Sequence, residues 1–151
     1  MSAFKIPVSV LVVVHTPALD VLLLERASRP GFWQSVTGSI DRDDEPLETT
    51  ALREVREETG IDAAAFSLAR WNVVNTFEIY PQWRHRYGPG VTRNTEHVFS
   101  IEVAVPLAVT VSPDEHLGYL WLPWREAAQK CFSWTNRDAI LALAERTRAP
   151  A

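Results

Sequence analysis

The 151-residue sequence predicts an α+β fold in which a mixed β-sheet carries helices on both of its faces. Short β-branched and aliphatic runs, which are typical of strands, alternate with longer stretches of helical periodicity. The length and the 46% hydrophobic content support one sizeable core, and the usual size of a domain leaves no room for a second. We therefore predict a single domain over residues 1–151.

The first strands are predicted close to the N-terminus. Residues 8–15 and 21–26 are aliphatic runs, and the turn-forming residues 16–20 separate them. Residues 33–36 form a short strand that leads into a loop at Gly38. These runs indicate consecutive strands of one sheet.

A helix is predicted over residues 46–59. Pro46 suits the first helical turn, where its missing N–H is not needed, and Gly60 suits a left-handed C-cap. The residues expected to be buried recur at spacings of three and four and are Leu47, Thr50, Ala51 and Val55, with Leu52 beside them. The pattern predicts one apolar face that packs on the sheet.

The second half of the chain predicts more strands and two further helices. Residues 66–80 are extended until Pro81 ends them, and the alternating residues 96–105 continue the sheet. Residues 117–122 form another strand. Helices begin near Trp124 and span about 135–147, the second with an aliphatic core face.

Acidic residues are concentrated in residues 41–58. The segment holds eight acidic and three basic side chains, a local net charge of −5, whereas the whole chain carries −4. Glu54, Glu57 and Glu58 are spaced i, i+3 and i+4, so we expect their carboxylates on one exposed helix face. A solvated face interlaced with arginines is the alternative for an arbitrary helix. Like charges at this spacing cost roughly 0.2–0.5 kcal/mol per pair, which a bound Mg²⁺ would remove.

The spacing of these residues resembles the Nudix hydrolase signature. Glu45 is followed, after seven residues, by the run Arg53-Glu54-Val55-Arg56-Glu57-Glu58-Thr59-Gly60-Ile61. One extra residue lies between Gly38 and Glu45, in the loop before the helix, where an insertion costs little. The resemblance implies an α/β/α sandwich and metal-dependent attack of water on a phosphorus. It implies catalytic roles for Arg53, Glu54, Glu57 and Glu58, of which the three glutamates would hold Mg²⁺, with Mn²⁺ as an alternative.

Segments outside this signature resemble one bacterial subgroup of the family. They are 33–39, 84–96, 115–117 and 133–137. The subgroup converts 7,8-dihydroneopterin triphosphate to the monophosphate and pyrophosphate in folate biosynthesis. The resemblance implies that Glu115 is a further catalytic residue and metal ligand. It implies substrate contacts at Lys5, Arg26, Thr37, Phe77, Glu78, Ile79, Tyr80 and Ser133.

Other interpretations of these residues stay open. Lys5 and Glu115 also suit solvated surface positions, while Phe77, Ile79 and Tyr80 also suit sheet core. The general base is open among Glu57, Glu96 and Glu115. For the whole protein the alternatives are a general (d)NTP diphosphatase, for example on dATP, and a non-catalytic Nudix ligand sensor. The retained box glutamates argue against the sensor.

Composition limits the partners and the compartment. An acidic chain argues against nucleic acid, because nucleic-acid affinity depends on a positive surface, so we expect a small-molecule substrate. The single cysteine, Cys131, fits a reducing compartment. The apolar run 8–14 is too short for a membrane span and lacks the pattern of a signal peptide. We expect a cytoplasmic protein without membrane contact, and the sequence leaves its oligomeric state open.

Overall fold

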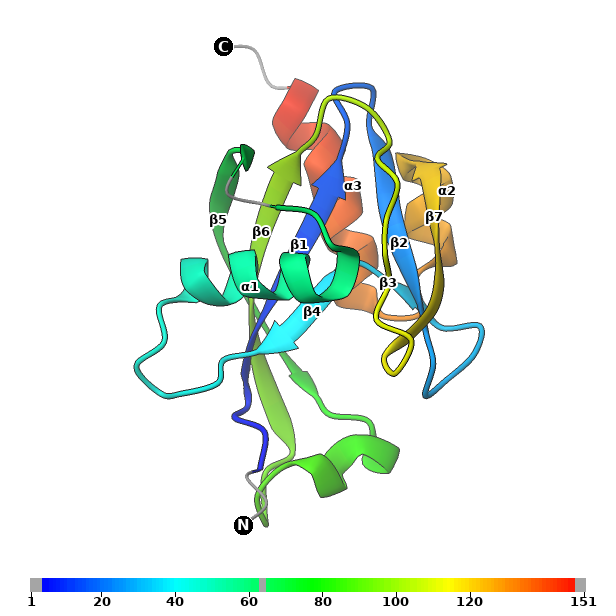
Figure 1. The fold of residues 1–151 in the computed structure, drawn as a ribbon. Coiled ribbons are helices and arrows are strands. Elements are labelled where there is room, and N and C mark those ends of the chain that lie inside the picture. The colour runs from blue at the N-terminus through cyan, green and yellow to red at the C-terminus, as the bar shows by residue number, and fades with distance from the viewer. Residues whose placement is uncertain (1–3, 63–64, 149–151) are drawn as a thin grey trace.

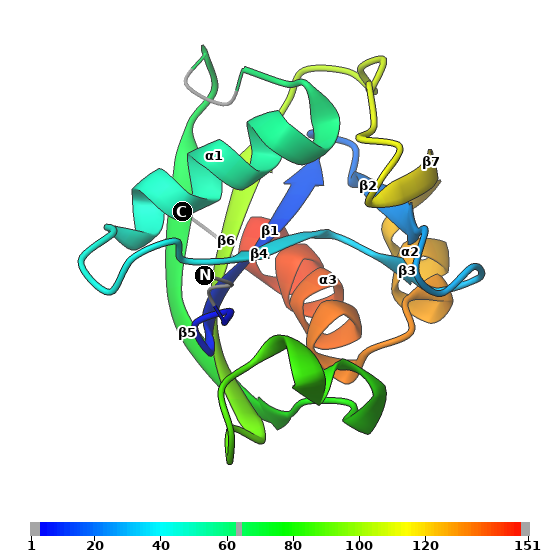
Figure 2. The same ribbon diagram turned by 60° about the horizontal axis from the view of Figure 1, so that its bottom comes forward.

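The computed structural model describes residues 4–62 and 65–148, which form a seven-stranded mixed sheet with helices on both faces (Figure 1). Helix α1 (Leu47–Thr59) covers one face, and α2 (Trp124–Lys130) and α3 (Trp134–Arg148) cover the other. Figure 2 shows α1 and α3 on opposite sides of the central strands. The predicted fold class is confirmed. No helix in the described part of the chain combines the length and apolar character needed to cross a membrane.

The sheet follows the order β3-β2-β1-β6-β5, with β4 beside β1 and β7 beside β2. Its strands are β1 (Val8–His15), β2 (Asp20–Arg26), β3 (Trp33–Gln34), β4 (Val36–Ser39), β5 (Leu68–Glu78), β6 (Arg93–Glu102) and β7 (His116–Pro123). Only β1 and β6 pair in parallel among the described strands. The strand predicted over 33–36 is divided in two. Ser35 stands at the break, where its backbone N–H donates to Asn136 Oδ1 at 2.8 Å.

Strand β1 is central, and its side chains alternate between two cores. One core lies beneath α1 and the other beneath α3, so both faces of the strand are buried, which explains its continuous apolar sequence. The α1 core contains Val10, Val12, Val14, Ala51 and Val55. The α3 core contains Leu11, Val13, Ile140 and Leu143.

Helix α1 forms as its sequence predicts. It begins at Leu47 directly after Pro46 and ends at Gly60, whose φ of 74° is left-handed and whose N–H donates to Arg56 O at 2.9 Å. Its predicted apolar face packs in the core beneath it. The helix therefore places Glu54 and Glu58 on one flank of this buried face, toward β4.

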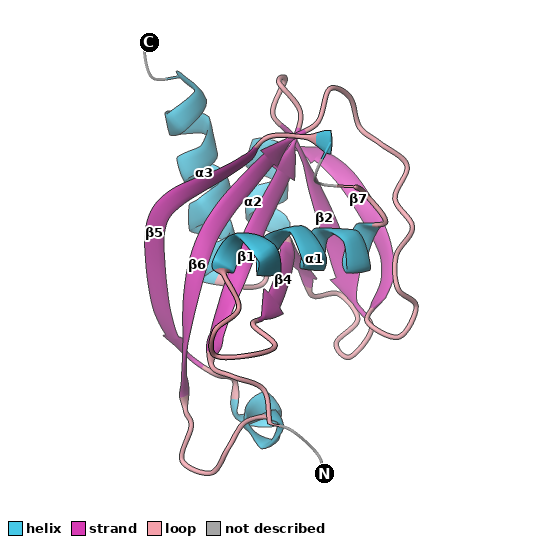
Figure 3. Cartoon of the chain, turned by 60° about the vertical axis from the view of Figure 1, so that its left-hand side comes forward, coloured by secondary structure: helices cyan, strands magenta, loops and turns pink. Residues whose placement is uncertain are grey.

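The strands converge at one end of the sheet and spread apart at the other (Figure 3). β1 pairs with β2 only at His15, and β4 takes its place beside β1 from Ser9 to Val12. A short 3₁₀ helix, η2 (Pro81–Arg86), follows β5 at the spread end and was not predicted. Pro81 ends the strand as expected, but it also starts this helical turn.

Candidate active site

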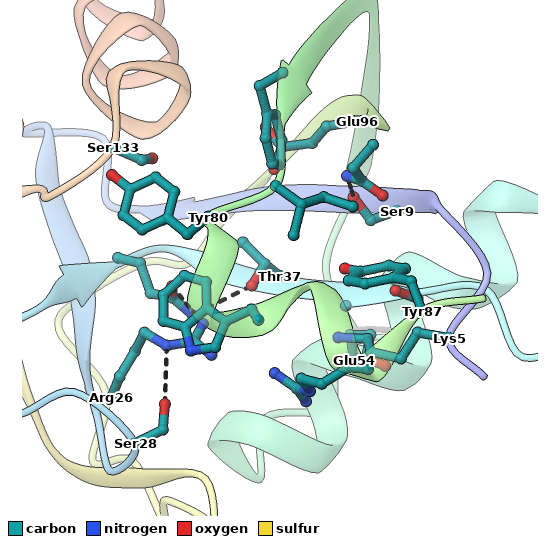
Figure 4. A pocket seen from close by; sticks show the side chains of 18 of the residues that line it. Lys5, Ser9, Arg26, Ser28, Thr37, Glu54, Tyr80, Tyr87, Glu96 and Ser133 are labelled. Carbon is teal, nitrogen blue, oxygen red and sulfur yellow. Dashed lines mark hydrogen bonds between the residues drawn. The ribbon is translucent and has the colours of Figure 1, made fainter. Parts of the chain in front are cut away.

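A pocket of about 1370 Å³ opens at the spread end of the sheet. It is lined by parts of β1, β4, β5, β6, α1, η2 and the start of α3, so residues far apart in the sequence meet there. Figure 4 shows Glu96 and Ser9 at one side of this pocket, Lys5 and Glu54 at another, and Arg26 with Ser28 at a third.

The pocket exists because α3 covers only part of its face of the sheet. Leu11 of β1 and Val98 of β6 lie side by side in register, and both pack in the core beneath α3. Two residues earlier on the same two strands, Ser9 lies beside Glu96. Side chains two residues apart point to the same face of a strand, so this face changes from apolar to polar where the pocket begins.

Glu54 and Glu58 of α1 lie inside the pocket and are buried, with Glu58 only 3% exposed. The expected exposed helix face is therefore wrong for these two residues and right for Glu57 alone. The reason is β4, which packs against α1 and covers both side chains. Gly38 makes this packing possible, because Glu54 occupies the space that a Cβ at position 38 would need.

Burial raises the pKa of both carboxyl groups, and that of Glu58, to which its contact with Glu54 also contributes, stands well above its usual range. The two groups share a hydrogen bond, while the backbone N–H of Thr37 donates to Glu58. Glu58 Oε1 is buried and has no hydrogen-bond partner among the described residues. Paired carboxylate oxygens with an unsatisfied acceptor fit a hard divalent cation, which would replace the missing positive charge.

The remaining predicted ligands surround this pair less closely. Glu115 is exposed in the loop before β7 and lines the pocket, and its charge contributes to the raised pKa of Glu58. His116 Nε2 lies 3.8 Å from Glu58 Oε1, but burial lowers the pKa of His116 to about 4, so the ring is neutral. Within residues 4–62 and 65–148, no three acidic, histidine or cysteine side chains already form a complete metal-ligand set.

Arg53 holds the carboxylates around it in place. Its guanidinium lies 2.9 Å from Glu45 Oε1 and 2.7 Å from Glu54 Oε1, and it also donates to Ser39 O at 3.3 Å. The hydrogen bond from Arg53 lowers the pKa of Glu45 to about 2. Glu57 lies 3.5 Å away across the surface. Arg53 is thus a positioning residue for Glu54, as its place in the signature suggests.

Three cations line the pocket near these carboxylates, and within residues 4–62 and 65–148 none of them forms a direct ion pair with an acidic side chain. Lys5, Arg26 and Arg86 line the pocket, and their mutual repulsion and burial lower the pKa of Lys5 to about 8 and that of Arg26 from its ordinary value. The Arg26 guanidinium stacks 4.3 Å from the Trp83 ring centroid and donates to Gln34 Oε1 at 3.1 Å. Such a group of confined cations favours a multiply charged anion.

The other predicted substrate residues also line the pocket, in different settings. Thr37 Oγ1 accepts from Gln34, Phe77 is half-buried, and Ile79 is buried as core. Tyr80 stacks on Trp83 with ring centroids 5.2 Å apart. Ser133 caps the start of α3, its Oγ accepting from the Asn136 side chain at 2.6 Å.

Glu78 lies at the rim, with 68% of its side chain exposed. Its carboxylate stands 3.8 Å from Arg84 and 3.9 Å from Arg93, both of which are exposed enough for solvent to weaken these contacts. The predicted role for Glu78 in contacting a ring therefore stays a prediction.

The fold adds residues that the sequence did not single out as site residues. Ser9, Asn94 and Arg86 line the pocket beside the predicted residues. Arg86 belongs to segment 84–96, which resembles the bacterial subgroup, but the sequence did not distinguish it from the other arginines of that segment. Ser9 and Asn94 carried no signal of their own, because single polar residues near strand ends are common.

A sandwich of helices on a mixed sheet, with buried paired glutamates facing confined cations, defines an enzyme that acts on phosphorylated small molecules. The NUDIX domain model matches residues 5–143. The dihydroneopterin triphosphate diphosphatase of Escherichia coli (strain K12) is 46% identical over 140 residues, or 91% of each chain, and the Haemophilus influenzae protein of that name is 38% identical over 93% of this chain and 89% of its own. The chain belongs to the Nudix family.

The solved structure of the E. coli dihydroneopterin triphosphate pyrophosphohydrolase superimposes with a TM-score of 0.89 and 41% identity over 96% of this chain and 99% of that one. The resemblance stated from the sequence is confirmed, and the protein is a Nudix pyrophosphohydrolase. Nudix hydrolases generally use divalent metal ions, in agreement with the carboxylate pair on α1.

Proposed function

We propose that the protein hydrolyses 7,8-dihydroneopterin triphosphate to dihydroneopterin monophosphate and pyrophosphate in folate biosynthesis, with Mg²⁺ as its metal. The observation that carries the proposal is the extent of the 46% identity, which covers 91% of both chains. A match of that length takes in the segments that line the pocket as well as the signature on α1.

The two ends of the pocket suit the two ends of such a substrate. Carboxylates and cations stand together at one end, around Glu58 and Lys5, where a triphosphate with metal would be held. Aromatic side chains and buried polar groups stand at the other end, around Phe77 and Glu96, where a flat ring with polar edges would fit.

Different side chains of the pocket would bind the phosphates and the ring of the substrate. Lys5, Arg26 and Arg86 would neutralise phosphate oxygens, and the stack of Arg26 on Trp83 keeps its guanidinium pointed into the pocket. Phe77 to Tyr80 and Ser133 would contact the pterin and its side chain. Thr37 links a metal carboxylate to a phosphate-binding cation, because its N–H holds Glu58 while its hydroxyl continues the network from Arg26 through Gln34.

Glu54 and Glu58 would hold the metal, with Glu115 as a third ligand and Glu57 at the exposed edge of the site. A bound divalent ion neutralises charge that develops on the phosphoryl oxygens and favours deprotonation of the attacking water. Mg²⁺ is favoured because all four side chains offer hard oxygen ligands, and Mn²⁺ accepts the same set. Arg53 positions Glu54 by its short hydrogen bond.

The proposal is tested by kcat/KM for dihydroneopterin triphosphate and for dATP, measured from pyrophosphate and monophosphate release with Mg²⁺ and again with Mn²⁺. We expect at least tenfold preference for the pterin, about the discrimination that one well-matched polar contact provides. Equal or greater rates on dATP would identify a general nucleotide diphosphatase instead. Metal-dependent binding without any product would identify a ligand sensor.

A further inference from the structure

Glu96 is a buried carboxylate to which the proposed reaction assigns no role. It lies on β6, is 3% exposed and lines the pocket, and its Oε1 has no hydrogen-bond partner. A hydrogen bond with Thr135 engages the group, and no ion pair reaches it within residues 4–62 and 65–148. A buried acceptor that the free protein leaves unsatisfied is costly, so its presence in a pocket points to a donor on the ligand.

A second unsatisfied acceptor lies beside it. Asn94, two residues earlier on β6, donates from Nδ2 to Ser9 Oγ at 2.7 Å, and its Oδ1 is buried without a partner. Ser9 in turn lies in register with Glu96 across β1 and β6. This end of the pocket therefore offers two buried acceptors that the described residues leave unsatisfied, which complement a ring edge that carries several N–H groups.

Glu96 lies two strands away from β4, the strand that packs on the carboxylates of α1. Thr37, whose N–H holds Glu58, lies beside Leu11 on β1, while Glu96 lies beside Ser9 on the next strand. With strands about 4.8 Å apart and a rise of about 3.3 Å per residue, the Cα atoms of Thr37 and Glu96 are about 12 Å apart. Figure 4 shows the two residues at separate places in the pocket, so a ligand that reaches both must be extended.

We propose that Glu96, with Asn94 beside it, determines substrate specificity by accepting the adjacent amino and ring N–H donors of a 2-amino-4-oxopyrimidine edge. Pterins and guanine share this edge, and both of its donors match the two oxygens of one carboxylate. Adenine instead presents an amino group beside an unprotonated ring nitrogen, whose lone pair would face the carboxylate. For the pterin, this role of Glu96 rests on the proposed function. A preference for guanine over adenine, by contrast, follows from Glu96 alone.

The surroundings of Glu96 support this choice over Glu78. Phe77 on β5 lies opposite Asn94 in register and is half-buried, so it offers a flat face beside the two acceptors. Glu78 is mostly exposed and lies near two arginines. Water can replace a hydrogen bond between its carboxylate and a ring, so such a bond contributes little to specificity. Burial raises the pKa of Glu96 to about 7, and N–H donors of a ligand would favour its ionised form.

The test compares Glu96→Gln with Glu102→Gln, an exposed glutamate on the same strand. Each variant and the wild type are assayed for kcat/KM on dihydroneopterin triphosphate, dGTP and dATP. For Glu96→Gln we expect a loss of roughly 10- to 100-fold on the pterin and on dGTP, mainly in KM, because the amide offers one acceptor in place of two. Activity on dATP should stay within about twofold, and Glu102→Gln should resemble the wild type on all three substrates.

Equal losses on all three substrates would overturn the inference and make Glu96 a structural residue. A wild-type enzyme without preference for the pterin over dATP would overturn the proposed function, while the ratio of dGTP to dATP would still decide the role of Glu96. Circular dichroism checks that each variant is folded. If Glu96→Gln does not fold, Glu96→Met takes its place, because it has similar volume and no polar atom to satisfy.

Discussion

The side chain of Glu54 packs directly over the Cα of Gly38, in the space that any larger residue at position 38 would fill. This contact brings α1 against β4 and places Glu54 between Arg53 and Glu58. The backbone of the strand thus determines where the carboxylate pair lies. Gly38 is not needed for a positive φ, since the described residues with positive φ do not include it.

Gly38→Ala should therefore weaken the metal site while the fold is retained. The new Cβ meets the flexible end of the Glu54 side chain, which can move away only by leaving its place beside Glu58. We expect kcat/KM with Mg²⁺ to fall by roughly 10- to 100-fold, the effect of misplacing a group that supports a metal site. Gly118→Ala is the control, because nothing lies near its added Cβ. Full activity of Gly38→Ala at low Mg²⁺ would contradict the packing argument.

Glu58→Gln should lower activity strongly without lowering the stability of the protein. A metal ligand supplies several kcal/mol of transition-state stabilisation, so turnover should fall by roughly 1000-fold. Without added metal, Tm should stay the same or rise, because burial disfavours an ionised carboxylate at this position and the amide stays neutral. Turnover and thermal unfolding measured on the same sample check both parts. A lower Tm together with retained turnover would mean that Glu58 is a structural residue and not a ligand.

The sequence predicted α1 in detail because its cap, apolar spacing and signature agree with one another. It did not predict that Glu54 and Glu58 are buried, because that depends on β4 folding over the helix and on the missing Cβ at Gly38. The separation of β3 from β4 could not be predicted from the sequence either, because it also depends on a contact between distant residues. Ser35 leaves the strand to bond Asn136, which lies 101 residues away in the chain.

The sequence named Glu96 as a candidate general base, although its position on β6 also indicates that it is buried. β6 is buried on both faces, and Glu96 alternates in phase with Val98 and Ser100, both of which are buried. A charged residue in such a position is expected to need a partner. The alternation alone did not show that α3 leaves Glu96 uncovered. It therefore could not distinguish a hydrogen-bonded core residue from a residue that lines a pocket.

Glu45→Gln should destabilise the protein at neutral pH and much less in acid. Its pKa falls from 4.5 in the unfolded chain to about 2 in the fold, so its stabilisation is present above pH 4.5 and is lost as the pH falls toward 2. We expect a loss of about 1–3 kcal/mol at pH 7, since Arg53 keeps other partners. Urea unfolding at pH 7 and pH 3 measures it. Glu48→Gln, an exposed glutamate on the same helix, should change little at either pH.

Glu96 should make the stability of the free protein depend on pH in the opposite direction. Burial raises its pKa from 4.5 to about 7, so the folded protein binds the proton more tightly than the unfolded chain does. The stability that Glu96 contributes is complete below pH 4.5 and is lost as the pH rises through 7. A shift of this size corresponds to roughly 2–4 kcal/mol between pH 4.5 and pH 8.

Glu96→Gln should remove that loss, because a neutral amide has no proton to release. Relative to the wild type, we expect the variant to gain about 2–4 kcal/mol in free energy of unfolding between pH 4.5 and pH 8, measured by urea unfolding without ligand. Glu54 and Glu58 also have raised pKa values, but they are present in both proteins and cancel in the difference. Glu102→Gln should show no such gain. If the variant and the wild type show the same change in free energy of unfolding between the two pH values, the Glu96 carboxylate is already ionised and solvated in the folded protein. Its Oε1 would then be hydrogen-bonded to water and not available as an unsatisfied acceptor for a ligand.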